Sequence, residues 1–196
     1  MKTLKATLAR LWLPTLVMAL TLTGCASAPP VDTRDETRSL VFGYFDMADA
    51  PSKVEWVSLR RYDAQKPGEW YALEVKDGLF FHVGIAPGSY QVEKFGGKGG
   101  IPLLTTRQFE YNFGSKGRNA TAVRIREPGL YFLGAHQYVN HAGKGMFAPD
   151  KFEMVAVKTP TEKELLARLV KVMESDKELS AYARQLGLAK RRLARL

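Results

Sequence analysis

The stretch WYALEVK-DG-LFFHVGI, residues 70–85, decides the fold class. Tyr71, Leu73 and Val75 alternate with polar or small residues, which is the period of a strand with one buried face. Asp77-Gly78 separates this run from the apolar run 79–85, and an Asp-Gly pair between two such runs is a strong β-hairpin signal. We therefore expect two antiparallel strands, 70–76 and 79–85, joined by a tight turn.

Similar runs extend outward from this hairpin in both directions. The other expected strands are residues 40–45, 54–62, 90–95, 109–113, 123–125, 130–136 and 152–157. Turn residues separate most of them, at 51–52, 66–68, 87–88, 96–100 and 128–129. Short strands at this spacing predict a mainly β protein. We expect an antiparallel β-sandwich of about 7–9 strands over residues 40–157.

A short motif, Pro-Gly-x-Tyr, occurs at Pro87–Tyr90 and again at Pro128–Tyr131. Proline and glycine suit the two central positions of a turn, so hairpin corners are favoured over a ligand-binding pair of tyrosines. A strand, this motif and a further strand resemble the prealbumin-like sandwiches, including carboxypeptidase-regulatory-like domains. The resemblance covers roughly residues 40–157. It implies a binding or spacer module without its own active site.

The composition changes at Lys158, and residues 158–196 are expected to be a basic helical appendage. Thr159-Pro160-Thr161-Glu162 has the pattern of a capping box with proline at the first helical position, and Ser175-Asp176-Lys177-Glu178 repeats the capping-box pattern. We predict helices over 160–174 and 176–186, with Gly187 as a stop or kink. We expect their apolar stripes to pack on the sandwich or on each other, or to dock on a partner. The final basic run, with Lys190, Arg191, Arg192 and Arg195, is either solvated or contacts an anionic surface.

The first 25 residues have the pattern of an export signal. Lys2, Lys5 and Arg10 precede an apolar run over residues 11–22, which as a helix would span roughly 18 Å, too short to cross a bilayer. Leu22-Thr23-Gly24-Cys25 follows. This arrangement resembles bacterial lipoprotein signals, with the lipobox at its end. The resemblance implies removal of residues 1–24 by cleavage between Gly24 and Cys25.

The same resemblance implies a diacylglycerol on the Cys25 thiol and a third acyl chain, such as palmitate, on its new amino group. Two or more chains give stable membrane attachment. An aspartate after the cysteine would retain such a protein in the inner membrane. Ala26 stands there instead, which in a host with two membranes implies the outer membrane, with the body facing the periplasm. Residues 25–39, with Pro29-Pro30 and few apolar side chains, are expected to be a lipidated tether.

Charge and cysteine content narrow the function classes. The chain carries 29 basic and 20 acidic residues. Without the three signal cations, residues 25–157 hold 16 basic against 15 acidic residues and residues 158–196 hold ten against five. A nearly neutral body is not expected to bind nucleic acid. Cys25 is the single cysteine, so no internal disulfide is possible.

No residue pattern indicates catalysis, a metal or a cofactor. His82 is expected on the strand face opposite Phe81 and Val83, in solvent, and the spacing of His136 and His141 does not suit one metal ion. The glycine-rich segment 96–100 lacks the lysine-serine or lysine-threonine pair of a phosphate loop and is expected to be a sandwich loop. We therefore expect a protein that is not an enzyme.

The expected function is that of a membrane-anchored lipoprotein, a non-enzymatic binding, spacer or adaptor module of the bacterial envelope. Its partners would be the membrane, through the lipid, and an envelope protein, an acidic wall polymer or lipid headgroups. The alternative is a lipid-anchored enzyme or small-ligand-binding protein with a site on the sandwich loops. A filled sandwich interior would favour the non-enzymatic binding module. A deep pocket near the histidines would favour the enzyme or small-ligand-binding protein.

Overall fold

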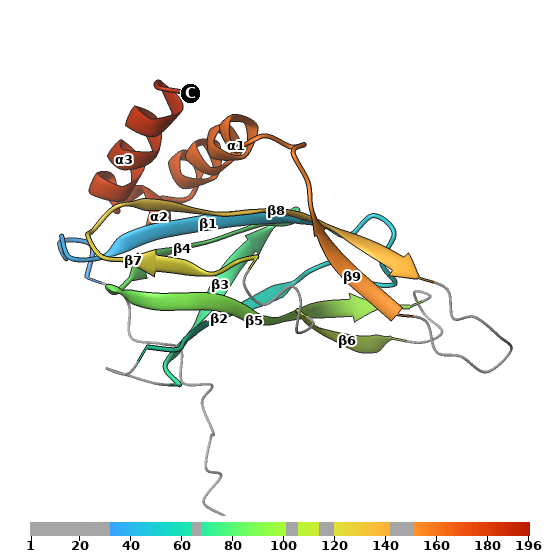
Figure 1. Ribbon diagram of the computed structural model, residues 1–196. Helices are drawn as coiled ribbons and strands as arrows, with labels where there is room; N and C mark the ends of the chain where they lie inside the picture. Colours follow the sequence, from blue (N-terminus) through green and yellow to red (C-terminus); the bar gives the residue numbers. More distant parts are fainter. Residues whose placement is uncertain (1–31, 64–67, 101–105, 114–119, 142–150) are drawn as a thin grey trace, which may run out of the picture. The chain divides into compact units, whose positions relative to one another are not determined.

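The hairpin at residues 70–85 forms as predicted. The computed structural model describes residues 32–63, 68–100, 106–113, 120–141 and 151–196, and in it β3 (Trp70–Lys76) pairs antiparallel with β4 (Leu79–Ile85) (Figure 1). Asp77 and Gly78 have φ values of 48° and 80°, and positive values at both positions are those of the tight turn that suits a twisted hairpin.

Every strand expected from the sequence is present, so the mainly β prediction is confirmed. The remaining strands are β1 (Ser39–Asp46), β2 (Trp56–Arg61), β5 (Gly88–Gly99), β6 (Arg107–Asn112), β7 (Val123–Ile125), β8 (Leu130–His141) and β9 (Lys151–Ala156). They form one sheet in the order β6-β5-β2-β3-β4-β1-β8-β9, and β7 also pairs with β5.

The sheet is mixed and curled, and it is not a clear antiparallel sandwich. β1 pairs antiparallel with β4 but parallel with β8, over Leu40 to Asp46 against Leu130 to Gln137. This corrects the expected all-antiparallel topology. The alternation within a strand shows which side chains share a face, but it carries no information on which distant strand lies alongside.

The curl brings the inner faces of the two ends of the sheet together. Tyr111 of β6 makes edge-on ring contacts with Tyr138 of β8 and Phe152 of β9, at centroid distances of 5.7 and 5.2 Å. Phe45 packs against both Phe80 and Phe95 in the same core, on the inner face of the sheet. The interior enclosed by the sheet is therefore a packed aromatic core.

The glycine-rich segment 96–100 was expected to be a loop, and most of it is strand. β5 continues to Gly99, with Gly96 and Gly97 opposite Glu110 and Phe109 of β6. A Cβ on Gly96 would lie 2.1 Å from the carbonyl oxygen of Phe109, and one on Gly97 would lie 2.1 Å from that of Lys53. These glycines allow a close backbone approach within the sheet.

Three helices follow the sheet, where two were predicted. They are α1 (Glu162–Ser175), α2 (Lys177–Ser180) and α3 (Ala183–Leu193). The capping box of α1 is formed by Thr161 and Glu164. The predicted capping box of Thr159 and Glu162 is therefore two residues too early, and the helix starts slightly later than predicted. The Asp176 side chain accepts hydrogen bonds from two backbone N–H groups of α2. The second predicted helix is interrupted before Ala183, and α3 continues through Gly187 rather than stopping there.

The helices cover the outer face of β1, β4 and β8. In Figure 1, α1 and α3 lie over β1 and β8. Leu165, Leu169 and Met173 of α1 are fully buried in a second core with strand residues that include Phe42 and Phe81. β1 and β4 are thus buried on both faces. This explains why the sequences of both strands are nearly continuous apolar runs. None of the described helices combines the length and apolarity that a membrane span requires.

Candidate functional site

His82 lies inside the curled sheet rather than in solvent. Its side chain is on the face opposite Phe81 and Val83, as predicted, but that face is the inner one, and His82 is only partly exposed. The prediction of a solvated ring is therefore wrong. The alternation of side chains along the strand predicted the correct face for His82. The curl of the sheet that encloses this face depends on pairing between distant strands, which the alternation does not show.

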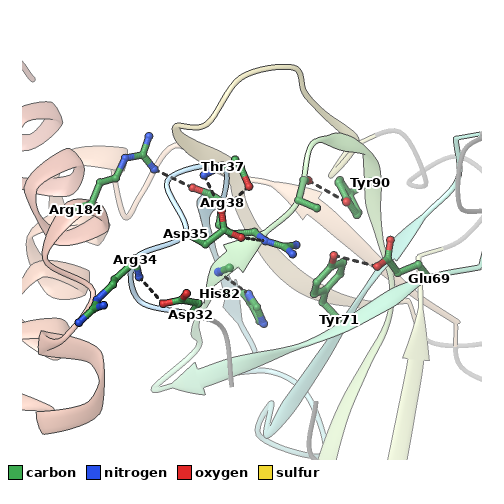
Figure 2. Close-up of polar contacts among 12 residues, drawn as sticks. Asp32, Arg34, Asp35, Thr37, Arg38, Glu69, Tyr71, His82, Tyr90 and Arg184 are labelled. Carbon is green, nitrogen blue, oxygen red and sulfur yellow. Dashed lines mark hydrogen bonds and ion pairs between the residues drawn. The ribbon is translucent and has the colours of Figure 1, made fainter. Parts of the chain in front are cut away.

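A polar cluster surrounds His82 at the start of β1 (Figure 2). The Gly84 N–H donates to His82 Nδ1 at 2.9 Å, and the Tyr71 ring makes an edge-on contact with the imidazole at 5.4 Å. Burial, and secondly the charge of Arg38, lower the pKa of His82 to about 4. The ring is therefore neutral at neutral pH, and the hydrogen bond to Nδ1 assigns the proton to Nε2.

Arg38 and its neighbours join this cluster to the helices. The Asp35 carboxylate accepts from Arg38 Nε at 2.7 Å and from the Thr37 N–H at 2.9 Å. Hydrogen bonds from Thr37 and then from Arg38 lower the pKa of Asp35 to about 2. Arg184 of α3 donates to the Arg38 carbonyl at 3.1 Å, as Figure 2 shows. These groups fasten the turn before β1 between the sheet and α3.

Arg61 is the most buried cation among the described residues. It is 4% exposed, and its Nε and Nη1 donate to Asp63 at 2.8 Å and Glu69 at 3.1 Å. Asp63 also accepts from the Ser89 N–H at 2.8 Å. A Cβ on Gly88 would lie 2.8 Å from Arg61 Nε. The buried charge is paired, as a protein interior requires, and it positions the backbone where β5 begins.

The two Pro-Gly-x-Tyr motifs are strand connections of the same design. The Tyr90 hydroxyl donates to the Ala86 carbonyl at 2.9 Å, and the Tyr131 hydroxyl donates to the Glu127 carbonyl at 2.7 Å, each four residues earlier. They are not hairpins, because β5 pairs with β2, β6 and β7, and β8 pairs with β1 and β9. Both tyrosine hydroxyls therefore stabilise the turns.

The other two histidines lie in β8 and do not share a site. His136 is 1% exposed, its ring meets Phe113 edge-on at 5.6 Å, and neither nitrogen has a hydrogen-bond partner among the described residues. Burial lowers the pKa of His136. His141 Nε2 lies 3.5 Å from Glu153, and both side chains are exposed. No metal-ligating group of three His, Cys, Asp or Glu side chains occurs in the described ranges.

Among the cavities on the described part of the surface, two lie against the sheet. One, of about 630 Å³, lies where β1 meets the turn between β3 and β4 and is lined by residues such as Phe45, Asp77 and Lys98. The other, of about 460 Å³, lies on the outer face of β2, β3, β5 and β6. We call it the tryptophan groove and define it by Trp56, Arg60, Trp70, Glu93, Lys94 and Glu110. No histidine lines either cavity.

Sequence patterns did not identify the tryptophan groove. Trp56, Arg60 and Trp70 occupy alternate, outward positions of their strands, which was a usable signal. Glu93 and Lys94 are consecutive and both line the groove, because a bulge in β5 leaves Glu93 as an extra residue between the pairs Ser58–Lys94 and Leu59–Val92. Such a bulge redirects a side chain, and the residues alone did not predict its position.

The basic C-terminal residues are in part paired with the helices. Lys190 contacts Glu174 at 2.6 Å and Arg192 contacts Glu162 at 3.0 Å, while Arg191 and Arg195 are exposed. Contact with an anionic surface stays a prediction for these residues. Gly24 and Cys25, the expected cleavage and lipidation site, lie outside the described residues. Comparison with protein-family models, curated proteins and solved structures gives no match to this chain.

Proposed function

We propose that this chain is a bacterial envelope lipoprotein, anchored to the outer membrane through acyl chains on Cys25, and that its β body is a non-enzymatic binding module. The anchor is supported by the sequence alone: a basic start, a short apolar run and Leu22-Thr23-Gly24-Cys25. The body would then be held near the membrane, because two or more acyl chains are not released readily.

Several polar groups of the described strands and turns have structural roles, which supports a binding module. His82 accepts a hydrogen bond from the backbone, Arg61 is held by two carboxylates, and the tyrosine hydroxyls of the turns donate to carbonyls. Each of these groups stabilises a turn or a strand junction. The enclosed face of the sheet is filled by aromatic rings. Contact with another molecule is therefore expected on the outer face.

The observation that carries the proposal is the tryptophan groove. Trp70 is 65% exposed, and large apolar side chains exposed beside a cavity are typical of interaction sites. The helices cover the outer face of β1, β4 and β8, while the outer face of β2, β3, β5 and β6 holds this cavity. The body thus combines a covered face with a face that offers a binding surface.

Fractionation of cells with two membranes tests the anchor. The wild-type chain is compared with Cys25→Ala and with Ala26→Asp by membrane separation and by mass spectrometry of the mature N-terminus. We expect acylated wild-type protein in the outer membrane, no acylation in Cys25→Ala, and Ala26→Asp in the inner membrane. An unmodified thiol, or an uncut leader, on the wild-type protein contradicts the proposal.

A further inference from the structure

We infer that the tryptophan groove binds an uncharged saccharide chain. This deepens the proposed binding role and rests on it. Indole side chains form two parts of the groove. Trp70 is largely exposed, and Trp56 lies directly opposite Gly96 across the β2–β5 pair.

Gly96 allows the Trp56 ring to lie close to the sheet. A Cβ at Gly96 would be 2.8 Å from Cζ2 and 3.1 Å from Cε2 of Trp56. The ring therefore lies against the backbone of Gly96 in a structure that contains no ligand. A preformed aromatic surface lowers the entropic cost of binding. The face of an indole carries negative charge density and packs well against the C–H groups of a pyranose ring.

The charged residues of the groove form two ion pairs. Arg60 contacts Glu93, and Lys94 contacts Glu110 at 2.8 Å. All four side chains are partly or largely exposed. The groove therefore holds two positive and two negative charges, and it has no net charge to attract an anionic or a cationic polymer. This charge balance favours an uncharged ligand.

The same ion pairs offer both kinds of hydrogen-bonding group. Arginine and lysine only donate, and carboxylates only accept. A sugar hydroxyl does both, so the hydroxyls of a saccharide can use the donors and the acceptors that these two ion pairs place in the groove. Aromatic faces and charged side chains together thus fit a neutral sugar better than a purely apolar ligand. The volume of about 460 Å³ lies within the range of about 300–1,000 Å³ that is typical of ligand sites.

Calorimetric titration of the full-length mature protein in detergent tests the inference. The probes are hexasaccharides of β-1,4-linked glucose and of β-1,4-linked N-acetylglucosamine. We expect at least one to bind and its Kd to rise at least tenfold in Trp70→Ala. The matched control is Tyr62→Ala, because Tyr62 is a similarly exposed aromatic residue, at 51%, that does not line the groove. Its Kd should stay within twofold of wild type.

Salt dependence separates a neutral sugar from a charged polymer. Saccharide binding should be the same at about 50 mM and about 500 mM NaCl, whereas attraction to a charged chain weakens as salt screens it. If neither hexasaccharide binds, the inference is overturned. It is also overturned if Trp70→Ala and Tyr62→Ala lose affinity for the saccharide equally. Two other results also overturn it. One is that neither hexasaccharide binds while polygalacturonate binds in a salt-sensitive manner, and the other is that neither hexasaccharide binds while a proline-rich peptide does. Acylation and fractionation of the same variants test the anchor separately, so the inference can fail while the proposed function stands.

Discussion

Arg192 and Glu162 are joined by two hydrogen bonds, from Nε to Oε1 at 3.0 Å and from Nη2 to Oε2 at 3.3 Å. They connect the last turn of α3 to the first residue of α1. Lys190 and Glu174 make a second contact between the same two helices. The basic end of the chain thus has a structural role in addition to any contact with an anionic surface.

Replacing Arg192 with alanine should destabilise the body modestly. The pair is partly exposed, so its coupling energy should be about 0.2–1 kcal/mol. A double-mutant cycle with Glu162→Ala, measured by urea unfolding, gives this value. The charge-swapped variant Glu162→Arg with Arg192→Glu should recover part of the loss. A cycle in which the two single effects simply add contradicts a stabilising role for the pair.

Arg191 and Arg195 should dominate any electrostatic contact of the tail with membranes. Both are exposed and have no ion pair among the described residues. In a chain that begins at residue 26 and so carries no acyl chains, the double variant Arg191→Ala, Arg195→Ala should bind vesicles rich in phosphatidylglycerol more weakly at low salt, by about 1 kcal/mol per residue removed. Arg34→Ala, which removes an exposed cation outside the tail, is the control. Equal binding of wild type and the double variant excludes this role.

Replacing Gln185 with leucine should stabilise the protein. Gln185 is fully buried in α3, and neither amide atom has a hydrogen-bond partner in the described part of the chain. An unsatisfied buried polar group costs about 1–3 kcal/mol, and leucine removes it at similar volume. Urea unfolding should show a higher midpoint for Gln185→Leu and a lower one for Gln185→Glu. A lower midpoint for Gln185→Leu would show that the amide has a stabilising contact.

The strands could be predicted from the sequence because their signals are local. Asp77-Gly78 determines one turn, and the alternation around it determines the faces of β3 and β4. The parallel pairing of Leu40 with Leu130 has no local signal, since it joins residues 90 apart. The same limit applies to the site. Trp56 and Trp70 are visible in the sequence, but their grouping with Glu110 depends on the order β6-β5-β2-β3.

Stability should fall as the pH is lowered from about 6.5 to about 4, partly because of His82. Its pKa is about 4 in the folded protein and near the ordinary value of 6.5 in the unfolded chain. Above pH 6.5 both forms are neutral, and below it the unfolded chain binds the proton first. The loss from His82 should approach about 3 kcal/mol near pH 4, since each pKa unit corresponds to about 1.4 kcal/mol. His136, whose pKa is also lowered by burial, acts in the same direction.

The variant His82→Asn isolates this contribution. The asparagine Oδ1 can accept the Gly84 N–H in place of Nδ1, but the side chain does not titrate. Urea unfolding between pH 7 and pH 4 should therefore give a shallower decline for His82→Asn than for wild type. His141→Asn, at an exposed position, should keep the wild-type slope. If His82→Asn declines as steeply as wild type, His82 is not held neutral by its surroundings.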